Sequence, residues 1–167
     1  MKNKLSELTK IGIFTSCALI VFIIEAQLPQ LIPIPGIKPG LSNIVTLCAL
    51  YIMGAKDAFI ILILRVLLGS FFSGTPVTLI YSLSGGILAF ISMIINKKLT
   101  VESQLPFVSI SGAIFHNLGQ IITAWIMMKS SAVFAYLPWL MISAVLTGLL
   151  TGVSAKFIIK GIKRQEP

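Results

Sequence analysis

Six apolar segments, separated by prolines, glycines and charged residues, make up most of this 167-residue chain. A helix needs about 20 apolar residues to cross a hydrocarbon core about 30 Å thick, and fewer where its ends are buried in a bundle. We therefore predict an all-α polytopic membrane protein: one six-transmembrane-helix bundle that forms a single membrane domain. The predicted spans are 11–28, 41–53, 58–72, 77–95, 107–128 and 137–159.

The composition and the breaks between the segments agree with this fold class. The chain is 56% hydrophobic and 11% charged, whereas soluble domains are about 25% charged. Four prolines between residues 29 and 39 end the first segment, Gly54 lies in a tight turn, and Pro76 is placed to open the fourth helix. The second span is short, so it could also be tilted or partly re-entrant. Cys17 and Cys48 both lie in apolar runs, which favours buried packing residues over a disulfide.

The basic residues predict that both termini are cytoplasmic. If the chain starts in the cytoplasm and crosses six times, ten of its thirteen Lys and Arg fall on the inner side and two, Lys38 and Lys129, on the outer side. The net charge of +8 therefore indicates orientation in the cell membrane and contact with lipid, not nucleic-acid binding. The inner set is Lys2, Lys4, Lys10, Lys56, Lys97, Lys98, Lys156, Lys160, Lys163 and Arg164.

The N-terminus also resembles a signal peptide, because lysines precede an apolar run. The run is long for the apolar region of a signal peptide, and the sequence of residues 25–27, Glu-Ala-Gln, is a poor cleavage site. We expect the first helix to be retained.

Polar residues within the spans are the main functional signal. An ionisable side chain at the membrane centre costs about 2.5–3.5 kcal/mol, so it usually faces a bundle interior or an aqueous cavity. At 1.5 Å of rise per residue, Arg65 lies about 12 Å from the inner end of its helix, near the midplane. His116 and Asn117 fall at a similar depth, and Gln120 lies one turn further out on the same face as His116.

Each of these residues has a structural as well as a functional interpretation. Glu25 lies in the outer third of the first span, and Arg65 could form a structural ion pair with it. Arg65 could instead bind an anionic substrate group, with Glu25 as its resting partner or as a second contact to the ligand, so Glu25 is also an expected substrate-binding residue. His116 could be a core hydrogen-bonding residue, and Asn117 and Gln120 could simply join helices. Asn43 could be a cap on the second helix.

Small residues four apart form two further patterns. Gly148 and Gly152 lie in the sixth span, and Gly12 and Ser16 lie in the first. Such pairs allow helices to approach closely, either within the bundle or against another membrane protein.

The loop 29–40 is apolar and rich in proline, and it contains Lys38. We expect it to lie across the outer mouth of the bundle, either as a lid over a cavity or as a passive plug. Lys38 is therefore counted with the expected substrate-binding residues.

Several classes of chemistry have no support in the sequence. The chain has no phosphate-binding loop, no metal-ligand motif and no nucleophile constellation, and Asp57 is its single aspartate. We therefore expect no catalytic residues, no metal and no cofactor, and we interpret the chain as not an enzyme.

Two blocks of sequence resemble the Gx transporter family, which is also labelled heptaprenyl diphosphate synthase component I. They are PGIKPGLSNIVTLCALYIMGAKDAFIILILRVLLGSFFSG, residues 35–74, and SGAIFHNLGQIITA, residues 111–124. That family is similar to the substrate-binding S components of energy-coupling factor transporters. The resemblance implies a six-helix protein that binds a small nutrient near the outer face, below a lid formed by the loop between the first two helices.

The resemblance also implies partners and residue roles. Residues 35–40 would form the lid, and the pocket would be lined by Asn43, Arg65, His116, Asn117 and Gln120. A transmembrane coupling protein would contact the helix face that carries Gly12 and Ser16, and two ATPase subunits would drive release.

The expected function is therefore a substrate-binding importer subunit for a small polar or anionic nutrient, or for an isoprenoid or quinone precursor. The alternative is a non-catalytic membrane subunit that accompanies a soluble prenyl diphosphate synthase. A prenyl synthase needs carboxylates that this chain lacks.

Overall fold

The structure is a computed structural model that describes residues 2–27, 38, 40–73 and 76–165. Over these residues the chain is helical, with six α-helices, two short 3-10 helices and no strand. The α-helices are α1 (Lys2–Gln27), α2 (Asn43–Ile52), α3 (Ala55–Ser73), α4 (Pro76–Leu99), α5 (Leu105–Met128) and α6 (Leu137–Gln165). The 3-10 helices are η1 (Glu102–Gln104), before α5, and η2 (Ser131–Tyr136), before α6.

The helix boundaries follow local backbone chemistry. Pro76 is the first residue of α4 and Pro106 the second of α5, where the missing N–H would have no helical partner anyway. Gly54 adopts a φ of +98° in the turn between α2 and α3, and Lys129 ends α5 in the left-handed conformation. The predicted opening of a helix at Pro76 is therefore confirmed.

One α-helix overlaps each predicted segment, but several helices extend beyond the predicted limits. The helix α1 begins at Lys2 rather than residue 11, and α6 ends at Gln165 rather than residue 159. The prediction counted apolar residues, whereas a helix continues into water wherever its backbone hydrogen bonds can form. The predicted loop 29–40 lies outside the described residues, apart from Lys38 and Gly40.

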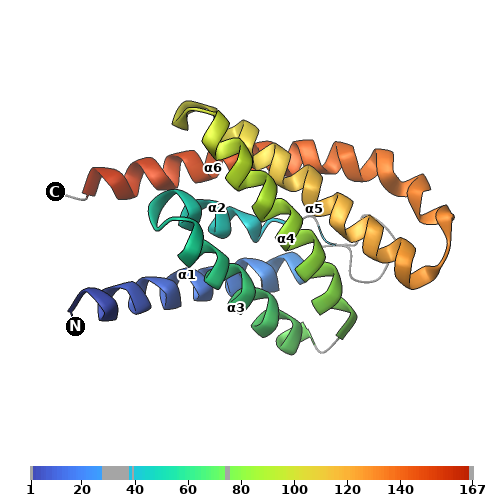
Figure 1. The fold of residues 1–167 in the computed structure, drawn as a ribbon, viewed down its shortest axis with the longest axis horizontal. Helices are drawn as coiled ribbons and strands as arrows, with labels where there is room; N and C mark the ends of the chain where they lie inside the picture. The colour runs from blue at the N-terminus through green and yellow to red at the C-terminus, as the bar shows by residue number, and fades with distance from the viewer. Residues whose placement is uncertain (1, 28–37, 39, 74–75, 166–167) are drawn as a thin grey trace.

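The helices form a bundle in which both termini lie at the same end (Figure 1). The turn between α2 and α3 lies at this end too, which we call the terminal end. The most extensive contacts join α5 to α4 on one side and to α6 on the other, while α1 packs mainly on α3. The short helix α2 contacts all of the other five helices.

Glycines allow α5 to pack closely against its neighbours. A Cβ on Gly119 would lie 2.8 Å from the Cα of Gly85 in α4. A Cβ on Gly148 or Gly152 would lie 2.6 Å from the Cα of Ile110 or Pro106, both in α5. The pair in α6 is therefore used for packing inside the bundle.

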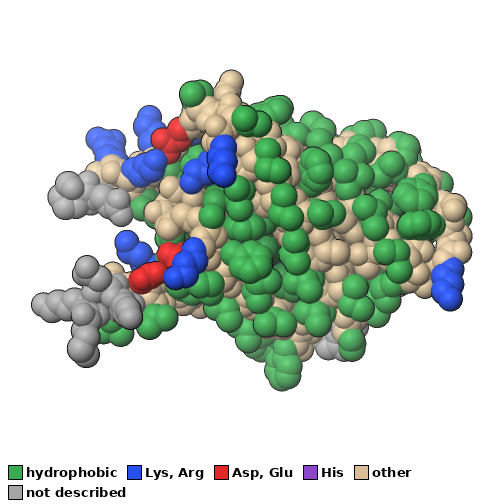
Figure 2. Space-filling view, viewed as in Figure 1, with side chains coloured by type: hydrophobic (Ala, Val, Ile, Leu, Met, Phe, Trp, Pro, Cys, Tyr) green, Lys and Arg blue, Asp and Glu red, His purple; other side chains and the backbone are tan. Residues whose placement is uncertain are grey.

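The surface has the character of a membrane protein. Figure 2 shows hydrophobic side chains over the middle of the visible face, and charged side chains gathered mostly at the terminal end. Within the described residues, four stretches are helical, long and apolar enough to cross a membrane: Leu5–Gln27, Pro76–Leu99, Glu102–Met128 and Ser131–Arg164. The protein is therefore a membrane-embedded helical protein.

The helix α2 is too short to cross a bilayer by itself. Its 10 residues rise about 15 Å, which is half the thickness of the hydrocarbon core. Six of these residues are buried, so α2 lies inside the bundle. Both cysteines are free, and Cys48 of α2 is buried while Cys17 of α1 is exposed. The packing explanation therefore applies to Cys48 alone.

Candidate functional site

Arg65 lies near the middle of α3 and is only 2% exposed. Its guanidinium donates one hydrogen bond to the hydroxyl of Ser42 and a second to Oδ1 of Asn43, at 3.1 Å. Both acceptors are neutral, and Nε has no hydrogen-bond partner among the described residues. A permanently charged group is thus buried among oxygen atoms that carry no formal charge.

Glu25 is buried near the end of α1, and its carboxylate faces the start of α2. Its Oε1 accepts hydrogen bonds from the backbone N–H groups of Gly40 and of Leu41, the latter at 3.0 Å. Its Oε2 accepts from the N–H of Ser42 at 3.3 Å. Because the N-terminus of a helix attracts negative charge, Glu25 stabilises this end of α2.

Glu25 and Arg65 do not form the direct ion pair that the sequence left open. Among the described side chains the ion pair within 4 Å is Lys163 with Glu102, at the terminal end. Glu25 is instead occupied by backbone donors, and the two charges are joined through Ser42.

His116 lies in α5 against the backbone of two glycines. Gly40 has a φ of +80°, and a Cβ placed on it would lie 2.7 Å from Cδ2 of His116. A Cβ on Gly85 would lie 2.8 Å from Nδ1 of the same ring. The imidazole therefore fills the space that side chains at residues 40 and 85 would need. Asn43 also adjoins Gly40, because its Nδ2 would lie 3.0 Å from a Cβ placed on Gly40.

Gln120 holds the loop that precedes α2. Its Oε1 accepts a hydrogen bond from the backbone N–H of Lys38 at 3.3 Å. The ammonium of Lys38 lies over the ring of Phe22 in α1, 3.9 Å from the centroid, which is a cation–π arrangement. Burial lowers the pKa of Lys38, and the negative charge of Glu25 partly offsets that effect.

Asn117 faces a different part of the bundle. Its Nδ2 donates to the backbone carbonyl of Leu140 in α6 at 2.7 Å. This contact fits the helix-joining interpretation, and no described contact links Asn117 to Arg65 or Glu25. Successive residues of a helix point about 100° apart, so His116 and Asn117 face different neighbours.

The structure thus connects most of the predicted site residues, which come from four helices and the loop before α2. Together with Ser42 and Gly40 they form what we call the polar cluster. Its members are Glu25, Lys38, Gly40, Ser42, Asn43, Arg65, His116 and Gln120.

The sequence placed Ser42 at a similar depth to the other polar residues of the spans, but Ser42 was not among the predicted site residues. It lies at the N-cap of α2, but its side chain makes no capping hydrogen bond and accepts from Arg65 instead. Asn43 is the first residue of α2 and also binds Arg65, so the capping interpretation of Asn43 is not supported. A serine at a helix start normally suggests a cap, so the sequence carried no signal for this role.

The cluster has donors available for an acceptor. Nε of Arg65 and Nδ2 of Asn43 are both buried, and neither has a hydrogen-bond partner among the described residues. Unpaired buried donors are uncommon because each loses its hydrogen bonds to water. No group of three metal-ligating side chains occurs in the described part of the chain. The arrangement therefore favours binding of an acceptor group, such as an oxyanion.

The predicted partner face on α1 is exposed. A Cβ on Gly12 would meet no atom within 4 Å. Ser16 is also exposed, and its hydroxyl bonds to the carbonyl of Gly12 in its own helix. This face is not used for packing within the described bundle, unlike Gly148 and Gly152.

Comparison with protein-family models gives a match. The family model described as heptaprenyl diphosphate synthase component I matches residues 14–158. No curated protein and no solved structure matches the chain.

Proposed function

The chain belongs to the heptaprenyl diphosphate synthase component I family, and on that premise we propose that it is a non-catalytic, substrate-binding subunit of a membrane importer. In this proposal all six helices form a transmembrane bundle with both termini in the cytoplasm. The polar cluster then lies toward the outer face of the cell membrane, where it binds a small anionic or polar nutrient or an isoprenoid or quinone precursor.

The observation that carries the proposal is the hydrogen bonding of the buried Arg65 guanidinium. A buried guanidinium is favoured when a charged partner and hydrogen bonds satisfy it. Here its two contacts are neutral oxygens, and the nearest candidate anion, Glu25, accepts three backbone N–H groups instead. An anionic group of a substrate would supply the missing acceptor for Nε.

In the proposed role, the site around Arg65 is lined by Glu25, Lys38, Asn43, His116 and Gln120. Gln120 and Lys38 would position the loop before α2, and the residues 35–40 would form the lid. Asn117 contributes by holding α5 against α6.

An importer subunit of this kind needs partners. We propose a transmembrane coupling protein that packs on the exposed face of α1 at Gly12 and Ser16, together with two ATPase subunits. The open space at Gly12 supports this assignment, because a neighbouring helix could approach there closely.

The test is ligand binding by the purified full-length protein. Mass spectrometry of the molecule that co-purifies would identify the ligand, and titration would then compare variants. Arg65→Ala should weaken binding at least about tenfold, because a buried charge-assisted hydrogen bond is lost. Lys156→Ala, an exposed basic residue at the terminal end, is the matched control. Unchanged affinity in Arg65→Ala, with retained fold, would remove Arg65 from the site.

A second candidate function rests on the family description itself. The protein would then be a membrane accessory subunit that accompanies a soluble prenyl diphosphate synthase. Purification in mild detergent distinguishes the two proposals. The importer predicts ATPases and a coupling protein as partners, and the accessory subunit predicts a synthase and no uptake defect on deletion.

A further inference from the structure

Two adjacent glycines of α4 bring the guanidinium and the imidazole of the polar cluster together. A Cβ on Gly85 would lie 2.8 Å from Nδ1 of His116, and a Cβ on Gly86 would lie 3.7 Å from Nη2 of Arg65. Arg65 and His116 therefore approach the same short stretch of α4, one from α3 and the other from α5. A group bound to Arg65 would lie inside the polar cluster, so the charges of that cluster limit what the group can be.

The formal charges of the polar cluster leave an excess of one positive charge. Arg65 and Lys38 are positive, Glu25 is negative, and the other members are neutral when His116 is in its neutral form. The carboxylate of Glu25 is already held by three backbone N–H groups. One negative charge on a ligand would make the cluster neutral, whereas two or more would leave excess negative charge in a region of low dielectric constant.

The available donors match the two oxygen atoms of a carboxylate. A guanidinium has five N–H groups, and the hydrogen bonds to Ser42 and Asn43 leave Nε without a partner among the described residues. The N–H of Nε lies parallel to one N–H of Nη2, and this fork binds a carboxylate through both of its oxygens. Nδ2 of Asn43 is a further donor without a partner, and it belongs to the amide whose oxygen contacts Nη2.

A phosphate group fits this cluster less well. A phosphate monoester carries about 1.5–2 negative charges at neutral pH, and a diphosphate carries more. Proteins commonly offset such charge with Mg²⁺ held by one or two carboxylates. Glu25 is the one carboxylate in the polar cluster, and its bonds to the backbone before α2 occupy it.

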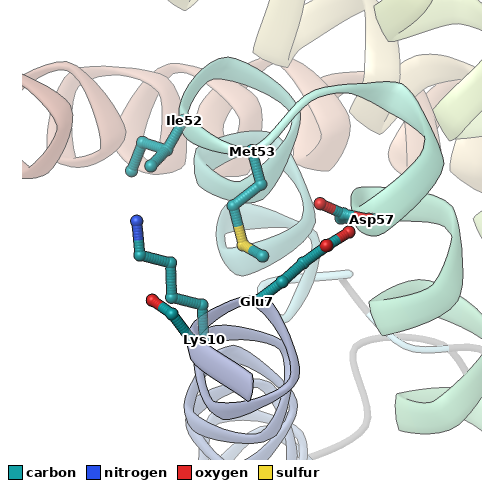
Figure 3. A pocket seen from close by; sticks show the side chains of 6 residues that line it. Glu7, Lys10, Ile52, Met53 and Asp57 are labelled. Atoms are coloured by element: carbon teal, nitrogen blue, oxygen red, sulfur yellow. The ribbon is translucent and has the colours of Figure 1, made fainter. Parts of the chain in front are cut away.

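The hollow at the terminal end has the opposite charge balance. It lies between α1 and the turn from α2 to α3, and in it the side chains of Glu7 and Asp57 point toward each other (Figure 3). Lys10 is the one basic residue among those that line it. Its lining therefore has an excess of one negative charge, which disfavours an anion there.

We propose that the polar cluster binds the carboxylate of a ligand that carries a single negative charge, and that it discriminates against phosphate and diphosphate groups. The carboxylate would bind the Nε edge of Arg65 and Nδ2 of Asn43. This inference rests on the proposed function and narrows its range of ligands. A nutrient or quinone precursor with one carboxylate fits, whereas a prenyl diphosphate does not.

The experiment measures the melting temperature of the purified full-length protein in detergent. Sodium acetate, phosphate and pyrophosphate are titrated at constant ionic strength, with sodium chloride as the reference. We expect saturable stabilisation by acetate, with an affinity at least about tenfold higher than that for phosphate or pyrophosphate. Arg65→Ala should abolish the response to acetate, and Arg65→Lys should weaken it about tenfold, because an ammonium keeps the charge but lacks the fork.

Two further variants complete the design. Lys156→Ala removes an exposed positive charge at the terminal end and should leave the response to acetate unchanged, which controls for non-specific anion binding. Asn43→Asp decides the question if the Arg65 variants do not fold, because it places a carboxylate of the chain itself against the guanidinium. We expect Asn43→Asp to raise the melting temperature of the ligand-free protein by about 2–4 °C and to abolish the response to acetate.

The outcomes separate this inference from the proposed function. If phosphate or pyrophosphate stabilises the protein more than acetate does, and Arg65→Ala removes that effect, the carboxylate assignment is wrong while the anion site stands. An acetate response that persists in both Arg65→Ala and Asn43→Asp would place the binding elsewhere and overturn the inference. If no salt gives a response that depends on Arg65, the carboxylate assignment and the role of Arg65 in the proposed function are both wrong.

Discussion

Glu25 and Arg65 are joined through Ser42 and not by direct contact. Glu25 accepts the backbone N–H of Ser42 at 3.3 Å, and Arg65 donates to the hydroxyl of the same residue. One residue at the start of α2 therefore links α1 to α3. The position of each charge depends on the backbone of residues 40–42. A conformational change in that segment would therefore move the side chains of both Glu25 and Arg65.

The first prediction concerns the carboxylate. Glu25→Gln keeps the size of the side chain but removes the charge and one acceptor from a site that binds three backbone N–H groups. We expect the free energy of unfolding in detergent to fall by about 1.5–3 kcal/mol, the range for hydrogen bonds to charged groups. Glu102→Gln, which changes an exposed carboxylate, should have little effect. Equal stability of the two variants would contradict the bonding described for Glu25.

The second prediction uses two glycines that share a backbone conformation. Gly40 and Gly54 both have positive φ, at +80° and +98°. A Cβ on Gly40 would lie 2.7 Å from His116, whereas a Cβ on Gly54 would meet nothing within 4 Å. Gly40→Ala and Gly54→Ala should therefore share a backbone penalty of about 1–2 kcal/mol, and only Gly40→Ala should add a steric one.

That steric difference can be measured directly. Chemical denaturation should show a larger loss of stability for Gly40→Ala than for Gly54→Ala, and ligand binding should weaken only in the former. Adding His116→Ala to Gly40→Ala should recover part of the difference, because it removes the atoms that clash. If the two alanine variants behave alike, the imidazole does not fill the space beside Gly40.

The third prediction concerns the link between Gln120 and the loop before α2. Gln120→Leu removes the acceptor for the N–H of Lys38. Amide hydrogen exchange at Lys38 should accelerate up to about tenfold, since a hydrogen bond contributes about 0.5–1.5 kcal/mol. Gln120→Glu keeps an acceptor and should retain slow exchange. Fast exchange at Lys38 in the unmodified protein would show that this bond does not persist.

The fourth prediction tests the contact between α5 and α6. Gly148→Ala would place a Cβ 2.6 Å from the Cα of Ile110, a backbone atom that cannot rotate away. We expect a loss of about 1–3 kcal/mol in the free energy of unfolding, as for other overpacked interiors. Gly161→Ala lies in the same helix with no atom within 4 Å, so it should be neutral or stabilising. A stable Gly148→Ala variant would mean that the two helices can separate at low cost.

The elements of the fold were largely predictable from the sequence because prolines, glycines and charges mark where apolar helices stop. What the sequence did not reveal is how far the helices continue past their apolar residues, as α1 does to Lys2. It also did not show that α2 is limited to Asn43–Ile52 and lies buried among the other helices. Those features depend on tertiary packing.

The site was predictable as a set of residues but not as a set of contacts. The polar character of Arg65, Glu25 and His116 within apolar segments was visible in the sequence. Their hydrogen-bond partners were not visible in the sequence. Glu25 binds backbone N–H groups, which every residue except proline carries, so no residue type marks them. Ser42 was visible as a polar residue at a similar depth but not as the acceptor for Arg65, and Asn117 was grouped with residues that face another direction.

The brevity of α2 has a consequence for how the protein is made. A helix of 10 residues has too little apolar surface to leave the translocation channel for lipid by itself. It must enter the bilayer together with the helices that cover it, and the donors ahead of its first turn stay exposed until the carboxylate of α1 reaches them. Because α6 contacts α2 as extensively as α3 does, we expect α2 to reach its final position only when the last helix has packed, so its insertion is coupled to helices from both ends of the chain.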